Sequence, residues 1–283
     1  MNYIKLIRPK QWIKNSFVFA ALIFSKKFIE IDAIEYSILL FIYFTIISSI
    51  IYIFNDINDA DNDKIHPKKK KRPIASGAIS KRNAVFFMCI LIIVSLIISI
   101  HFDIGVNIVI ILYIINNIIY TTGFKNYIII DVMMISIGFL LRVIAGALVL
   151  EVYISSWIII CTFFLSMLMG LGKRRSEIVY LEDSAASHRH NLKLYSIKLI
   201  DYMLNICVGC TLITYTLYSI LEYDNKIFMI TNMFVFYGIF RYVYLIFSED
   251  SCKMPAEIII EDKPLLINIL SFGISCILIL LYI

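Results

Sequence analysis

Long, uninterrupted apolar runs constrain this chain more than any other feature. A helix needs about 20 apolar residues to cross the hydrocarbon core of a bilayer, and several runs approach or exceed that length. Many are rich in isoleucine, a strand-favouring residue, but they are too long for the strands of a soluble sheet. With 60% hydrophobic residues, 17% charged residues and a mean hydropathy of +0.86, the composition also excludes a soluble globular protein. We expect an all-α integral membrane protein with a single domain over residues 1–283.

Nine apolar segments are candidates for membrane-spanning helices. They cover residues 13–25, 33–53, 84–101, 105–120, 127–150, 154–171, 199–220, 227–247 and 264–283. The first is short and follows basic residues, so a signal peptide is the alternative interpretation. Because Lys26, Lys27 and Phe28 follow it without a convincing cleavage site, we expect a first span and nine membrane helices in total.

The distribution of Lys and Arg predicts the orientation in the membrane. With the N-terminus inside, the inner segments contain all but five of the 26 basic residues. The exceptions are Lys26, Lys27 and Lys226 in outer segments, and Arg142 and Arg241 within spans. Because cytoplasmic loops are enriched in Lys and Arg, we expect a protein of the cytoplasmic membrane with its N-terminus inside and its C-terminus outside. The net charge of +5 then indicates contact with lipid headgroups and phosphorylated substrates, and no nucleic acid.

Three long polar segments, 54–83, 172–198 and 248–263, fall on the predicted inner side, whereas the outer connections are short. Active sites gather where polar loops meet over a rigid scaffold. We therefore expect an active site on the cytoplasmic side of the bundle. A lipid or ion carrier is the alternative of another class, but a carrier would distribute charge through both halves of the membrane.

The most informative polar segment is N-D-I-N-D-A-D-N-D at 55–63, which continues the second span. At helical spacing Asn55, Asp59 and Asp63 lie one turn apart on one face, with Asp56 beside them and Asp61 roughly opposite. Like charges four residues apart repel, so this face requires a cation. Carboxylates with water and substrate phosphate oxygens are the usual ligands of Mg²⁺. A solvated acidic turn is the alternative interpretation.

A basic run, K-K-K-K-R at 68–72, follows directly. Such a run beside a span usually sets topology through its attraction to anionic lipids. Next to a metal-binding face it can also hold phosphates that a metal ion bridges. We expect Arg72 to contact substrate and the lysines to act mainly on topology.

The fifth span contains a second polar set, because Asp131 and Arg142 lie on one helical stripe about 16 Å apart. An arginine at that depth costs about 2.5–3.5 kcal/mol on insertion scales, so it should face a cavity or a partner. We favour a functional cavity, with a structural buried salt bridge as the alternative. Tyr120 and Lys125 precede this span and form a second polar rim with Asp131.

Two further groups of charged residues belong to the predicted inner side. Lys173, Arg174 and Glu177 close the sixth span. Arg8 and Lys14 lie in an N-terminal segment that is typical of an interfacial amphipathic entry.

Taken together, these motifs resemble the UbiA-type superfamily of intramembrane prenyltransferases. Asn55, Asp56, Asp59 and Asp63 match its N-D-x-x-D-x-x-x-D signature. Within it, the chain is most similar to the branch of decaprenyl-phosphate phosphoribosyltransferases. The features of that branch are R-P-K-Q-W-I-K-N at 8–15, H-P-K-K-K-K-R-P-I-A-S-G at 66–77, Y-x-x-x-F-K-x-x-x-x-x-D at 120–131, L-R-V-I-A-G-A at 141–147, G-K-R-x-x-E at 172–177 and R-Y at 241–242.

The resemblance implies a nine-helix UbiA-like bundle that uses Mg²⁺ to transfer 5-phosphoribose from phosphoribosyl diphosphate to a polyprenyl phosphate. It implies metal ligands Asn55, Asp56, Asp59 and Asp63, and catalytic residues Asp59, Asp63, Lys125 and Asp131. The implied substrate-binding residues are Arg8, Lys14, Asn55, Arg72, Tyr120, Arg142, Lys173, Arg174 and Glu177. Prenyl transfer from an allylic diphosphate to a small aromatic acceptor is the alternative within the superfamily. Membrane lipids are expected partners, and homo-oligomerisation stays open.

Overall fold

The computed structural model describes residues 2–65, 69–181, 194–223, 225–248, 258 and 261–282, and all regular structure in them is helical. Eight helical segments there are long and apolar enough to cross a membrane. They are α3 (Ile31–Asn58), α5 (Lys81–Ser99), α6 (Ile104–Thr122), α7 (Ile130–Val149), α8 (Ser156–Leu181), α10 (Ile197–Leu221), α11 (Thr231–Ser248), which continues from the short 3-10 helix η7 (Lys226–Ile230), and α13 (Lys263–Tyr282). The expected all-α membrane class is confirmed.

The first expected span, 13–25, is not one long α-helix. A 3-10 helix, η1 (Pro9–Val18), runs into the short α-helix α2 (Phe19–Phe24), and a small N-terminal helix, α1 (Asn2–Leu6), precedes both. The 3-10 helix rises ~2.0 Å per residue and the α-helix ~1.5 Å, so η1 and α2 have a summed helical length of about 29 Å. This segment is not one of the eight long apolar helices, and a count of nine spans stays a prediction.

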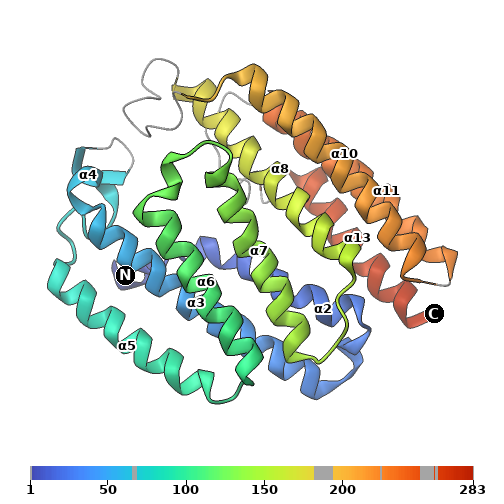
Figure 1. Cartoon of the computed structure of the whole chain (residues 1–283), viewed down its shortest axis with the longest axis horizontal. Helices are drawn as coiled ribbons and strands as arrows, with labels where there is room; N and C mark the ends of the chain where they lie inside the picture. Colours follow the sequence, from blue (N-terminus) through green and yellow to red (C-terminus); the bar gives the residue numbers. More distant parts are fainter. Residues whose placement is uncertain are drawn as a thin grey trace.

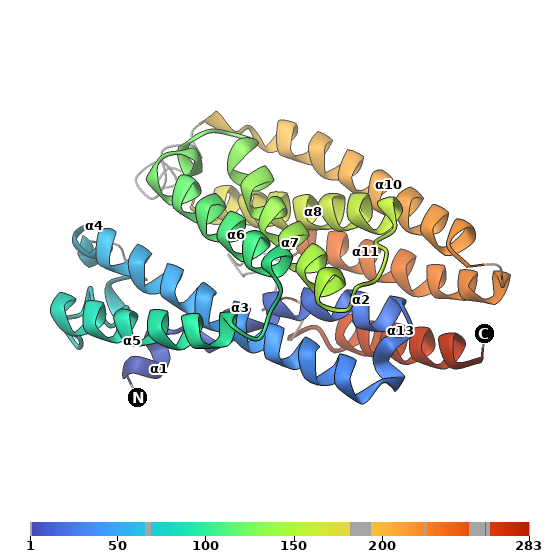
Figure 2. The same cartoon turned by 60° about the horizontal axis from the view of Figure 1, so that its bottom comes forward.

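The eight long helices form a bundle in which sequence neighbours pack side by side (Figure 1). The closely packed pairs include α3 with α5, α6 with α7, α8 with α10, and α11 with α13. The N-terminus lies at one end of the bundle and the C-terminus at the other in both views (Figures 1 and 2). The short helix α4 (Ala60–Ile65) and the α6–α7 connection lie at the N-terminal end. Polar residues from distant parts of the chain therefore meet at that end.

Burial separates the inner helices from the peripheral ones. In the most apolar window of α3, 56% of residues are buried inside the protein, against 11% for α5 and 17% for α13. The apolar residues of α5 and α13 are therefore available to face lipid. Because α3 and α7 are more enclosed, polar side chains on them can face partners within the bundle.

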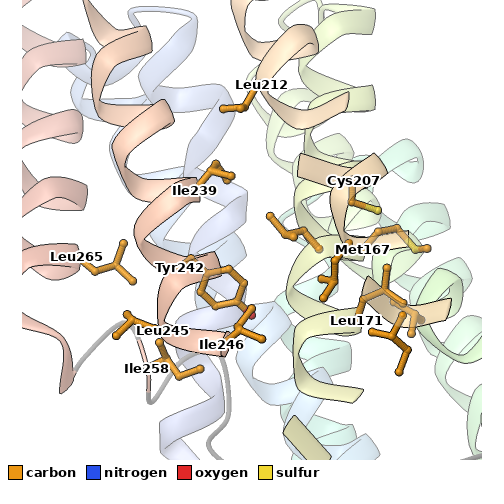
Figure 3. Packing of buried hydrophobic residues seen from close by; sticks show 14 of the residues in the cluster. Met167, Leu171, Cys207, Leu212, Ile239, Tyr242, Leu245, Ile246, Ile258 and Leu265 are labelled. Carbon is orange, nitrogen blue, oxygen red and sulfur yellow. The ribbon is translucent and has the colours of Figure 1, made fainter. Parts of the chain in front are cut away.

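The largest hydrophobic cluster joins α8, α10, α11 and α13 (Figure 3). Its labelled members are Met167, Leu171, Cys207, Leu212, Ile239, Tyr242, Leu245, Ile246, Ile258 and Leu265. A second cluster, around Phe44 and Tyr113, joins α3, α6 and α7. Ion pairs add to this packing near the start of α10 and of α13, where Arg175 binds Asp201 at 2.7 Å and Arg241 binds Asp262 at 2.8 Å.

The backbones of η1 and α7 come into close contact at Gly146. A Cβ atom at this position would lie 2.2 Å from the carbonyl oxygen of Val18, which is itself fully buried in η1. Glycine is therefore required here for a steric reason. The contact fixes the position of η1, and with it the basic residues of the N-terminal segment, against the centre of the bundle.

We expect Gly146→Ala to lower the stability of the folded protein by about 3 kcal/mol or more, because the obstructing atom belongs to backbone and cannot rotate away. Thermal unfolding in detergent micelles measures this loss. Gly209→Ala on α10 is the matched control, because a Cβ atom added there would meet nothing within 4 Å and alanine favours the helix. Equal unfolding temperatures for the two variants would contradict the steric argument.

Candidate active site

An acidic face runs through the junction of α3 and α4. Although α3 ends at Asn58 and α4 begins at Ala60, the Asp59 amide donates to the Asn55 carbonyl at 2.9 Å and the Asp63 amide to the Asp59 carbonyl at 2.8 Å. The helical register therefore continues through the break. Asn55, Asp59 and Asp63 lie one turn apart on one face, as their spacing predicted.

Two arginines bind the buried carboxylates of this face. Asp56 and Asp63 are only 2% and 3% exposed. The Arg72 Nη1 atom donates to Asp56 Oδ1 at 3.1 Å and to Asp63 Oδ2 at 2.6 Å, and Arg8 also binds Asp56 Oδ1. The Arg72 guanidinium thus neutralises both carboxylates, and the predicted contact of Arg72 with substrate stays a prediction. The N-terminal segment is tied to α3 by the Arg8 ion pair.

The side-chain oxygens of Asn55 and Asp59 have fewer or weaker polar contacts to the protein than those of Asp56 and Asp63. The Asn55 Oδ1 atom is buried and has no hydrogen-bond partner. The Asp59 side chain is 36% exposed and lies 3.5 Å from Lys125 Nζ, which is carried by the short helix η4 (Phe124–Asn126). A buried amide oxygen without a partner is costly, and a bound ligand would remove that cost.

This pair of oxygen donors fits Mg²⁺. The ion prefers oxygen ligands and usually keeps several waters, so it needs only one or two carboxylates together with substrate phosphates. Among the described residues, no three His, Cys, Asp or Glu side chains are close enough to hold a metal ion alone. A magnesium ion at this face would therefore rely on Asn55, on Asp59 and on oxygens of substrate and water. The predicted four-residue ligand set stays a prediction.

A second centre surrounds Asp131, at the start of α7. Its carboxylate is fully buried, and Arg174 Nε donates to Oδ2 at 2.8 Å while the Tyr195 hydroxyl donates to Oδ1 at 2.9 Å. Arg174 also binds Glu177, and Lys173 lies 3.7 Å from the same glutamate. From the sequence, Asp131 and the charged end of α8 were two separate groups on the inner side. The structure brings these two groups into direct contact.

The backbone just before Asp131 is strained. Ile129 has φ 67° and ψ −52°, and the Ile130 amide donates to the Ile128 carbonyl at 2.7 Å, which closes a three-residue γ-turn. A β-branched residue at positive φ is a true outlier, and such a conformation costs about 1–3 kcal/mol. The Ile129 amide donates to the Tyr195 hydroxyl at 2.6 Å, so the same phenol contacts both the strained turn and Asp131.

Arg142 does not pair with Asp131, so the structural salt bridge between them is absent. Its Nε donates to Asn15 Oδ1 at 2.9 Å, its Nη1 to the Gly138 carbonyl at 2.7 Å and its Nη2 to the Tyr113 hydroxyl at 2.7 Å. The side chain is only 4% exposed. All three nitrogens therefore have protein partners, and the role in substrate binding predicted for Arg142 stays a prediction.

Basic side chains of the N-terminal segment, α7 and α8 interact electrostatically and form what we call the basic cluster. Lys14 lies within electrostatic range of three arginines, and Lys173 within range of Lys14. Tyr120 interacts electrostatically with the α8 members. The members are Arg8, Lys14, Arg142, Lys173 and Arg174. Like charges gathered in a partly buried space repel one another, and a bound anion offsets that repulsion.

The predicted site residues are thus drawn into one region. Arg8 binds the acidic face while Lys14, in the same segment, interacts with the end of α8. Lys125 links η4 to Asp59. The motif at 66–77 lies partly outside the described residues, which omit 66–68, and so does the polar segment 172–198, of which 182–193 are omitted. Tyr195 and Asn15 carry contacts that sequence reasoning missed, because no spacing rule relates them to Asp131 and Arg142.

Comparison with known proteins agrees with this arrangement. A model of the UbiA prenyltransferase family matches residues 16–257. The chain belongs to the UbiA prenyltransferase family. It is 32% identical to decaprenyl-phosphate phosphoribosyltransferase of Mycolicibacterium smegmatis, over 76% of this chain and 69% of that protein. It is 30% identical to the protein of the same name from Corynebacterium glutamicum, over 99% of this chain and 86% of that protein. The resemblance to this branch is confirmed.

Solved structures of UbiA proteins share the fold. A UbiA homologue from Archaeoglobus fulgidus bound to DMAPP and Mg²⁺ superposes with a TM-score of 0.73, at 20% identity, over 100% of this chain and 97% of that one. A digeranylgeranylglyceryl phosphate synthase gives a TM-score of 0.63, at 23% identity, over 98% of both chains. Members of the fold therefore include proteins that bind a prenyl diphosphate and magnesium.

We expect Arg174→Met to lower the unfolding temperature by about 10 °C, because it leaves the buried Asp131 carboxylate without its arginine, a change that costs about 3–5 kcal/mol. The double variant Asp131→Leu/Arg174→Met should recover part of this loss, because it removes both charges. Thermal unfolding in detergent measures both. A double variant less stable than the single one would show that the pair does not act as a unit.

Proposed function

We propose that this protein transfers 5-phosphoribose from phosphoribosyl diphosphate to a polyprenyl phosphate, releases diphosphate and depends on Mg²⁺. The observation that carries the proposal is the basic cluster lying beside an acidic face that fits magnesium. The names of the relatives support the same reaction. The acceptor is a lipid, so an integral membrane protein of this family is a suitable scaffold.

The number of phosphates favours this reaction over prenyl transfer. Phosphoribosyl diphosphate and a polyprenyl phosphate together bring a diphosphate and two separate phosphates, whereas an allylic diphosphate brings one diphosphate. Within the cluster, Lys14 and Lys173 are the cations that we assign to those groups, because its arginines are bound to protein partners. Residues Val132 to Ile135 add no second carboxylate after Asp131, and Asp131 is held by Arg174 and Tyr195. That pattern argues against a second metal-binding aspartate pair.

The site residues account for the chemistry by binding and orientation. Asn55 and Asp59, with Asp56 and Asp63 nearby, would hold Mg²⁺ on the diphosphate. A bound magnesium ion neutralises the charge that develops on the leaving diphosphate. Lys125, close to Asp59, is placed to bind a phosphate oxygen of the same group.

The acceptor needs little activation by the protein. A lipid phosphate is already an anionic oxygen nucleophile at neutral pH, so no strong general base is required. Its oxygen forms a bond to ribose C1 as the bond from C1 to the diphosphate oxygen breaks. In-line displacement from the α-diphosphate gives a β-linked product. Lys14, Lys173 and Arg174 would orient the two phosphates, and positioning of this kind lowers the barrier strongly.

The same proposal places the site on the cytoplasmic side. The junction of α3 and α4, which carries the acidic face, lies at the end of the bundle that holds the N-terminus, and the C-terminus lies at the opposite end (Figure 2). The excess of Lys and Arg in the segments on that side supports an inside location for the N-terminus. A water-soluble donor such as phosphoribosyl diphosphate would then reach the site from the cytoplasm.

The first test is transfer of radiolabelled ribose phosphate from phosphoribosyl diphosphate to polyprenyl phosphate by purified protein with Mg²⁺. Label should appear in the lipid fraction and be lost with EDTA. Asp59→Asn should reduce the rate by about 100-fold or more, because it removes a carboxylate from the proposed metal site.

Asp61→Asn is the matched control on the same acidic segment. Asp61 is exposed and points to Lys64 and Lys81, whose hydrogen bonds lower its pKa, so it belongs to a surface ion pair. Its variant should keep the wild-type rate. An equal loss in both variants, or wild-type protein that instead consumes an allylic diphosphate with an aromatic acceptor, would overturn the proposal.

A second test concerns the basic cluster. Lys14→Gln and Lys173→Gln should each raise KM for phosphoribosyl diphosphate by roughly 10- to 100-fold, because each removes a charge-assisted contact to phosphate. We expect kcat to change less, since a phosphate away from the reacting bond is bound equally in ground and transition states. Lys198→Gln, at an exposed position on α10, should leave KM unchanged. A similar rise in that control would point to a non-specific charge effect.

A further inference from the structure

We infer that Tyr195 is a positioning residue of this site, which holds Asp131, and through it Arg174, in the orientation that binds substrate phosphate. This inference rests on the proposed function. Tyr195 lies just before α10, far in sequence from the acidic motif and from the charged end of α8. It belongs to none of the motifs that identify the family branch.

The phenol of Tyr195 makes two hydrogen bonds in opposite directions. It accepts from the Ile129 amide at 2.6 Å and donates to Asp131 Oδ1 at 2.9 Å. A hydroxyl can serve as acceptor and donor at once, whereas an aromatic ring without it can do neither. Burial raises the pKa of the Tyr195 phenol, and the Asp131 carboxylate raises it further, so the group keeps its proton for donation.

The first hydrogen bond acts on a strained segment. Ile129 holds a positive φ within the γ-turn that precedes Asp131, a conformation that an isoleucine adopts only when the surroundings impose it. Tyr195 therefore fixes the backbone from which α7 starts.

The second hydrogen bond gives each oxygen of the Asp131 carboxylate its own partner. Tyr195 binds Oδ1 and Arg174 binds Oδ2. With one oxygen held by the phenol, the other faces the guanidinium in a single orientation. Arg174 also binds Glu177 and interacts with Lys14, so its direction affects the basic cluster as a whole.

Hydrophobic packing alone does not explain why residue 195 carries a hydroxyl group. Tyr195 is 5% exposed and belongs to the largest hydrophobic cluster, which joins α8, α10, α11 and α13. A phenylalanine would keep that packing and lose only the two hydrogen bonds. Tyr195→Phe therefore isolates the proposed role from the general stability of the bundle.

The test compares Tyr195→Phe with Tyr215→Phe in the phosphoribosyl transfer assay. Tyr215 is also buried and also hydrogen-bonded, to Thr231 at 2.8 Å, but its helix position is toward the outer end of α10. We expect Tyr195→Phe to lower kcat by roughly 10- to 100-fold, the loss of a hydrogen bond to a charged group. Tyr215→Phe should keep the wild-type kcat, and both variants should show similar unfolding temperatures.

A double-mutant cycle decides whether Tyr195 acts through Asp131. If it does, Tyr195→Phe has little further effect in an Asp131→Asn background, whereas two independent contributions multiply. An unchanged kcat in Tyr195→Phe, or equal effects in both backgrounds, overturns the inference. Failure of the proposed function is a separate result, since wild-type protein would then transfer no phosphoribose, and the cycle would be measured on the reaction that it does catalyse.

Discussion

Buried carboxylates paired with arginines from other segments are the interaction on which the active-site end of this protein depends. Asp56 and Asp63 on α3 and α4 bind Arg8 and Arg72, and Asp131 on α7 binds Arg174 on α8. Each pair joins two different segments of the chain at this end of the bundle. Removing one partner of a buried pair is costly, so these contacts specify one arrangement of the helix ends.

The charges that hold the helix ends together also create the chemical character of the site. The arginines neutralise the most deeply buried aspartates, while the more exposed Asp59 and the unpartnered oxygen of Asn55 stay available for a cation. Lys14 and Lys173 are close to other cations and are therefore suited to an anion. Under the proposed function, a metal-bound diphosphate carries both kinds of charge and would complement both parts of the site.

Much of this organisation was predictable from the sequence, because it follows from local periodicity. The long apolar runs predicted most of the helices within a few residues, although α8 extends ten residues beyond the expected span, and the spacing of Asn55, Asp59 and Asp63 predicted their common face. The first span was less predictable, since a 3-10 helix has no distinct apolar pattern. Contacts such as Tyr195 with Asp131 or Asn15 with Arg142 join residues far apart in the chain, and only the packing of the helices brings them together.

The close approach of η1 to α7 at Gly146 has a consequence for inhibition. Gly146 has no side chain that could rotate to relieve the contact with the Val18 backbone. At this level η1 and α7 therefore form one rigid unit. Asn15 and Lys14 precede Val18 on the same short helix, and Asn15 binds Arg142 one turn before Gly146. A small hydrophobic compound that separated these two helices would displace Asn15 and Lys14 together with η1. Resistance to it by substitution at Gly146 would be difficult, because no larger residue fits there.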